Sequence, residues 1–199
     1  MDLLKQLKSE AVARDLIAPE TNLDAAKVYT LVRDMPYRRA SDRRPETIIA
    51  EWQGTCSGKH YLLKELFALL GLKARVMACT TITEVSPEVV PESQRRLYEA
   101  ANRRFVDVHN FLLVSLPEGG EMQVDATWPL SAEKKGVKVN KTFELGKDQE
   151  LAAEPLHTWS IPEDRDPQAF KQELLQTHFT PAELEFREEV IKFLGNHSA

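Results

Sequence analysis

Two spacing patterns of apolar residues alternate along this chain, and together they predict helices followed by strands. Over residues 62–70, leucine and phenylalanine recur at the three- and four-residue spacing of one buried helical stripe. Gly71 follows the last apolar residue, where a left-handed C-cap is favoured. Thr55 or Ser57 can cap the opposite end. The pattern therefore predicts a helix that begins near Cys56 and ends before Gly71.

The N-terminal quarter of the chain also has helical spacing. Leucines between residues 3 and 12 predict a first amphipathic helix, and Asn22 or Asp24 can cap a second one that ends before Pro36. Pro45 opens a short third helical turn that leads to the cysteine.

After the cysteine helix the pattern changes to alternation with many β-branched residues, which is typical of strands. Three segments have this pattern: residues 73–85, 104–116 and 121–128. A polar insertion with one helical turn separates the first two, and Pro117, Gly119 and Gly120 predict a hairpin between the last two.

The register of this hairpin decides which polar side chains meet. We pair Ser115 with Glu121. His109 then faces Thr127, and Asp125 is its diagonal neighbour on the same surface. A one-residue slip would separate the two side chains. We expect the cysteine helix to pack on this face and to complete a Cys-His-Asp triad.

The apolar pattern weakens in the C-terminal part. Residues 131–165 are expected to be largely irregular. Asp166 and Pro167 predict the start of one helix. Thr180 and Glu183 form a capping box at the start of a last helix, which we interpret as a structural buttress.

Length indicates one domain, and 42% hydrophobic with 29% charged residues indicates a globular protein with a real core. The helices and strands expected above make it an α+β domain of 199 residues. We divide it into an N-terminal helical part (1–52), a core (53–130) and a C-terminal extension with two helices (131–199).

A formal charge of -5 gives no general attraction to nucleic acid. The chain has no apolar run of membrane-spanning length and a charged start, so we expect a cytoplasmic protein without membrane partners. Its two cysteines are no disulfide framework.

Cys56 is the first candidate for chemistry, because it lies in or beside the first turn of its predicted helix. Free backbone N–H groups and the helix dipole favour an anion there, so the thiol should ionise easily. The alternative is a small buried hydrophobe, as we expect for Cys79. The place of Cys56 before the apolar stripe argues against that alternative.

A cysteine, a histidine and a carboxylate in this arrangement can perform acyl transfer. His109 would take the thiol proton and Asp125 would orient the imidazole. Cys56 would attack an amide or ester carbonyl, and the resulting thioester would react with water or an amine. The N–H of Cys56, helped by Gln53 or Trp52, would stabilise the oxyanion. Further candidates for lining the cleft are Thr55, His60, Asn110 and Trp128.

Short motifs occur in order around these residues: Gly54-x-Cys56, Leu62-Leu63 followed by residues 71–76, His109-Asn110-Phe111, and residues 124–128. Together they resemble the transglutaminase-like superfamily over about residues 54–128. The resemblance implies a papain-like core with the nucleophile helix packed on a small antiparallel sheet. It also implies Cys56 as nucleophile, His109 as base and Asp125 as the residue that orients it.

Several polar residues around the triad have alternative roles. His60 lies one helical turn after Cys56 and suits a cleft-lining or capping role better than that of the base. A zinc site at the triad residues lacks a tight pair of ligand motifs, so we expect no metal and no cofactor. The arginines between residues 38 and 44 indicate a solvated loop, or a contact to an acidic substrate.

Two classes of function remain. The first is a thiol-dependent enzyme that acts on the amide bonds of a peptide, a protein or a small amide, as a peptidase, an amidase or deamidase, or a transglutaminase-like enzyme. The second is a non-catalytic binding or scaffold protein. A perturbed thiol in an intact triad would favour the first, and a blocked cleft or a His109 side chain turned away would favour the second.

Overall fold

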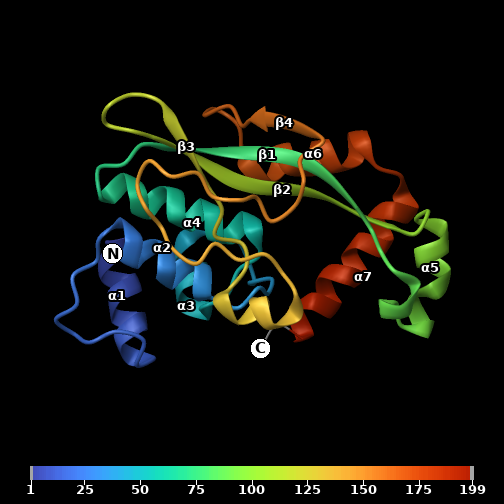
Figure 1. Cartoon of the computed structure of the whole chain (residues 1–199), viewed down its shortest axis with the longest axis horizontal. Helices are drawn as coiled ribbons and strands as arrows, with labels where there is room; N and C mark the ends of the chain where they lie inside the picture. Colours follow the sequence, from blue (N-terminus) through green and yellow to red (C-terminus); the bar gives the residue numbers. More distant parts are fainter. Residues whose placement is uncertain (1, 198–199) are drawn as a thin grey trace.

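The strands form one antiparallel sheet with the order β3-β2-β1-β4, which runs across the upper part of the molecule in Figure 1. The computed structural model describes residues 2–197, and this part has the predicted α+β class. The strands are β1 (Ala74–Glu84), β2 (Arg104–Ser115), β3 (Glu121–Val124) and β4 (His157–Ser160). The predicted strands correspond to β1, β2 and a shortened β3.

Helices surround this sheet. Their bounds are α1 (Leu3–Ala13), α2 (Ala25–Asp34), α3 (Pro45–Glu51), α4 (Cys56–Leu69), α5 (Arg95–Ala100), α6 (Pro167–His178) and α7 (Pro181–His197). Short 3-10 turns lie at Pro87–Val89, Glu92–Gln94 and Leu130–Lys135. In Figure 1, α1, α2 and α3 gather at one end of the molecule, α4 runs along the sheet, and α7 lies towards the other end.

The predicted helix ends are confirmed. Thr55 is the N-cap of α4, although its side chain makes no capping bond. Gly71 has φ +80°, and the N–H of Leu72 donates to the carbonyl of Phe67 at 2.9 Å. This is the left-handed termination expected from glycine at that position. At the C-terminal end, the Glu183 carboxylate accepts from the N–H of Thr180 at 2.8 Å, as in a capping box.

The predicted hairpin register is also confirmed, since Ser115 pairs with Glu121. The ladder nevertheless ends after Val124, so β3 is half as long as predicted. The backbone beyond it takes other partners. The N–H of Asp125 donates to the Gln149 side chain at 2.9 Å, and the N–H of Thr127 donates to the Asp125 carboxylate at 2.9 Å. These local bonds replace the bonds of the ladder.

Strand β4 was missed, because residues 131–165 were expected to be irregular. It is a four-residue edge strand that pairs with β1 from Met77 to Thr80. Trp159 is its only side chain that is partly buried. Such a short, mostly exposed segment has no periodic apolar pattern to identify it.

The main core lies on one face of the sheet, where Val106, Val108 and Leu112 of β2 belong to the same apolar cluster as Leu63 and Phe67 of α4. Met77, Cys79 and Phe111 form a separate, smaller cluster on the opposite face. The helix therefore packs on the Val106 face, not on the face of His109 as expected. The start of α4 nevertheless contacts a polar residue of β2, since the Ser57 hydroxyl donates to Asn110 at 2.8 Å.

Within residues 2–197, no helix is long and apolar enough to cross a lipid bilayer.

Candidate active site

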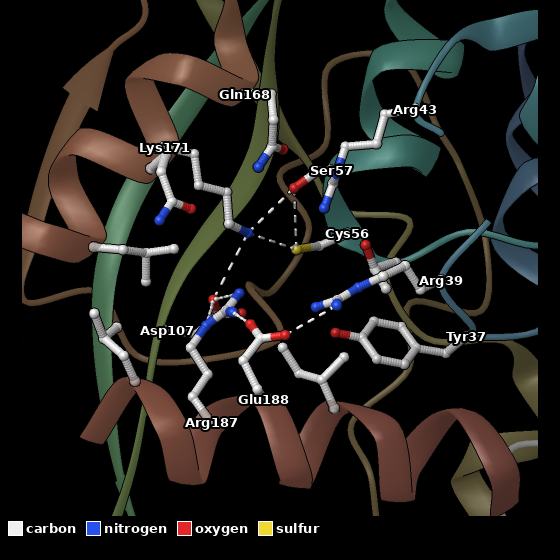
Figure 2. A pocket seen from close by; sticks show the side chains of 15 residues that line it. Tyr37, Arg39, Arg43, Cys56, Ser57, Asp107, Gln168, Lys171, Arg187 and Glu188 are labelled. Atoms are coloured by element: carbon white, nitrogen blue, oxygen red, sulfur yellow. Dashed lines mark hydrogen bonds and ion pairs between the residues drawn. The ribbon is translucent and has the colours of Figure 1, made fainter. Parts of the chain in front are cut away.

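Cys56 is the first residue of α4 and lines a cavity of about 370 Å³ (Figure 2). Its own exposed fraction is only 2%. The cavity walls come from the loop before α3, from the start of α4, and from α6 and α7. The first N–H groups of any helix lack intrahelical acceptors, so those at the start of α4 can receive an anion beside the thiol.

His109 and Asp125 meet as predicted. The Nε2 of His109 lies 2.7 Å from the Oδ2 of Asp125. Both carboxylate oxygens are fixed by backbone donors, because the N–H of Thr127 donates to Oδ1 at 2.9 Å and the N–H of Ala152 to Oδ2 at 2.8 Å. Since the Nε2 of His109 bonds to Asp125, the Nδ1 of His109 is the ring nitrogen that can interact with Cys56.

The electrostatics favour a thiolate beside an imidazolium. Burial raises the pKa of Cys56, but the charge of Lys171 and a hydrogen bond from His109 outweigh it and lower that pKa to about 6. Burial likewise lowers the pKa of His109, and the charge and hydrogen bond of Asp125, with those of Cys56, raise it to about 10. The pKa of Asp125 is well below its usual range despite burial, because of the charge of His109.

Lys171 is a second cation at the thiol that was not predicted. Its Nζ lies 3.6 Å from the Sγ of Cys56 and 3.1 Å from the Oγ of Ser57. The side chain extends from α6 and is buried. One signal could have revealed it: Lys171 precedes Leu174 and Leu175 by three and four residues, so it shares their buried helical stripe.

Asp107 balances the charge of Lys171. Its Oδ1 lies 3.7 Å from the Nζ of Lys171 and accepts from the guanidinium of Arg187 at 2.6 Å. Burial raises the pKa of Asp107, but the charges of Lys171 and Arg187 outweigh it and lower that pKa below its usual range. Arg187 belongs to α7. The last helix therefore supplies polar residues to the cavity wall in addition to its expected role as a buttress.

His60 is placed for structure and not for proton transfer. Its Nδ1 donates to the carbonyl of Cys56 at 2.7 Å, and its Nε2 accepts from the N–H of Ala126 at 2.9 Å. Burial lowers its pKa to about 4, so the ring is neutral at physiological pH. It thereby connects α4 to the segment that carries Asp125.

Gln53 and Trp52, the two side chains expected to help at the oxyanion, do not line the cavity. The Gln53 amide donates to the carbonyl of Arg39 at 3.1 Å. Trp52 packs in the main core, and the guanidinium of Arg14 lies over its ring at 5.3 Å. The cavity therefore gives no support to an oxyanion role for these two side chains.

The remaining candidates lie in or behind the cavity wall. Thr55 lines the cavity. Asn110 accepts from the Ser57 hydroxyl at 2.8 Å and holds it in place. The ring of Trp128 lies 4.3 Å from that of Tyr37, which lines the cavity.

Sequence reasoning also missed Lys59. Its side chain is fully buried, and its Nζ donates to the carbonyl of Arg33 at 2.8 Å and to that of Thr127 at 3.0 Å. Burial lowers its pKa to about 7. It thus connects α2, α4 and the segment after Asp125.

Comparison with protein families, with curated proteins and with solved structures finds no match for this chain. In residues 2–197, no group of three or more His, Cys, Asp and Glu side chains is arranged to hold a metal ion. Function has to be argued from the site itself.

Proposed function

We propose that this protein is a thiol-dependent acyl-transfer enzyme that acts on amide bonds, with a papain-like core of the transglutaminase-like kind. One observation carries the proposal. A buried His109–Asp125 pair at 2.7 Å adjoins a cysteine whose pKa is lowered to about 6, and that cysteine opens on a cavity. Perturbed pKa values of this kind, gathered at a cavity, are typical of catalytic sites.

The proposed reaction uses Cys56 as the nucleophile and His109 as the proton donor. The thiolate of Cys56 attacks the carbonyl carbon of the amide, and the electron pair of the C=O bond moves to its oxygen. The tetrahedral intermediate then collapses, the C–N bond breaks, and His109 gives its proton to the leaving amine. A thioester on Cys56 remains, and water or a second amine attacks it.

Asp125 keeps the imidazole oriented throughout, as in other triads. Backbone N–H groups at the start of α4 and the ammonium of Lys171 are the donors available to the developing oxyanion. Both act in a buried site, where such interactions are stronger than in water.

The alternative is a non-catalytic protein that binds a partner at this cavity. Burial favours this alternative in one respect, since Cys56 is only 2% exposed and the Nζ of Lys171 lies 3.6 Å from its sulfur. A reducing compartment such as the cytoplasm, which we also propose, would keep the thiol free for either function.

The rate of Cys56 alkylation by iodoacetamide as a function of pH tests the proposal. We expect fast labelling that rises near pH 6 in the wild type. In His109→Gln the rise should move to a clearly higher pH, although Lys171 still lowers the pKa of the thiol. Cys79 is the internal control, because burial raises its pKa to about 12. Equal profiles for wild type and His109→Gln would contradict the proposed function.

A further inference from the structure

Four basic side chains line the cavity beside Cys56: Arg39, Arg43, Lys171 and Arg187. Three of them have acidic partners. Arg39 pairs with Glu188 at 2.9 Å, and Arg187 and Lys171 both pair with Asp107. Within residues 2–197, Arg43 has no such ion pair. Its charge is therefore available to a ligand.

Arg43 and Gln168 each present a polar atom without a partner. The Nε of Arg43 and the Oε1 of Gln168 are buried, and neither makes a hydrogen bond within the described part of the chain. Figure 2 shows both side chains beside Ser57, Arg43 from the loop before α3 and Gln168 from α6. Since buried polar groups are normally satisfied, a donor and an acceptor left open together indicate a ligand.

The same two residues also line a second cavity, of about 570 Å³. Arg43 and Gln168 therefore lie between the two cavities and contribute to the walls of both. The second cavity has a largely apolar wall that includes Pro45, Tyr61 and Val76. Its charged lining is balanced, with the acids Glu46, Glu65 and Asp166 and the bases Arg43, Arg44 and Lys64. The first cavity instead has its four bases against two acids, Asp107 and Glu188, so an anion is favoured on that side.

We propose that Arg43 and Gln168 form a specificity subsite that selects an acyl donor carrying a carboxylate beside an amide N–H, as an acidic peptide does. The Nε and one terminal nitrogen of Arg43 would hold the carboxylate side-on, and the Oε1 of Gln168 would accept from the N–H. The carboxylate would lie on the side of the first cavity, and the uncharged remainder of the substrate would extend into the second. This inference rests on the proposed function and names its substrate class.

Protection of Cys56 from iodoacetamide tests the subsite. Two neutral-capped ligands serve as probes, N-acetylglutamate α-methylamide and N-acetylglutamine α-methylamide, which differ in the carboxylate alone. In the wild type, we expect the acidic ligand to protect at a concentration about tenfold lower or more, as one charge-assisted hydrogen bond implies.

Variants assign this preference to its residues. In Arg43→Gln, the protecting concentrations of the two ligands should differ by about threefold or less. Arg43→Lys should leave an intermediate preference, because lysine keeps the charge but lacks the planar guanidinium that binds a carboxylate through two nitrogens. Gln168→Leu should weaken both ligands alike. Arg38→Gln is the matched control, since it removes an equal charge from the same loop outside both cavities, and it should keep the wild-type preference.

Equal or absent protection by the two ligands in the wild type would overturn the subsite, as would a full preference in Arg43→Gln. Either result could occur while labelling of Cys56 stays fast and dependent on His109, so the proposed function would survive it. Slow labelling that is independent of His109 would instead refute the proposed function.

Discussion

Replacing Lys171 by methionine removes the second cation at the thiol and keeps the length of the side chain. The Nζ of Lys171 lies 3.6 Å from the Sγ of Cys56, and both residues are buried. Coulomb's law at that distance gives about 1 kcal/mol in a water-like medium and about 4.6 kcal/mol at an effective dielectric constant of about 20. One pKa unit corresponds to about 1.4 kcal/mol, so the pKa of Cys56 should rise by about 1 to 3 units.

The ultraviolet absorbance of the thiolate, followed during a pH titration, measures this shift directly. We expect the midpoint for Cys56 to move from about 6 towards that of an ordinary thiol in Lys171→Met. Lys147→Met is the control, because this lysine is 68% exposed and pairs with Glu144 in a surface loop. A folded Lys171→Met protein with the wild-type midpoint would refute the assignment of Lys171 to the thiolate.

Three further changes test the same structure. Gly58→Ala should lower the free energy of unfolding by about 1–3 kcal/mol in denaturant titrations, because the new Cβ would lie 2.6 Å from the Cδ1 of Ile48. Adding Ile48→Val, which removes that Cδ1, should restore part of the lost stability. A double variant no more stable than Gly58→Ala would contradict this clash. Asp125→Asn should lower the pKa of His109 below about 10, visible as a downward shift of the imidazole titration by NMR. The free energy of unfolding of the wild type should rise with pH between about 7 and about 10.4, by about 5 kcal/mol at most, because in this window the unfolded chain binds the proton that the folded chain has lost. Lys59→Met should abolish this rise. Equal pH slopes for the two proteins would rule out a depressed pKa at Lys59.

Most of the fold that positions the triad was predictable from local signals. Gly71 and the apolar stripe before it predicted the position of the helix that begins at Cys56. Turn residues between two alternating segments predicted the hairpin that carries His109. Helix ends and strand faces depend on the spacing of nearby residues, so they can be recognised in the sequence. The meeting of His109 and Asp125 was predicted from the hairpin register, although Asp125 lies just beyond the end of the ladder and is held there by Gln149 and Ala152.

The rest of the site depends on contacts between distant segments, which no local pattern encodes. Lys171 is more than a hundred residues from Cys56 along the chain, and Arg187 reaches Asp107 from the last helix. The position of Gln53 could not be predicted either, because its amide bonds to the chain before α3. The packing of α6 and α7 against the sheet brings these groups to the thiol, so they become visible only in the structure.

The most direct test of acyl transfer is a stoichiometric burst with an activated ester. With p-nitrophenyl acetate near neutral pH, we expect release of one equivalent of p-nitrophenol, slower turnover afterwards, and an acetyl group on Cys56 in intact-protein and peptide mass spectra. His109→Gln should lose the burst. Absence of a burst in the wild type, or acetylation confined to lysines, would contradict the account of Cys56 as an acyl-transfer nucleophile.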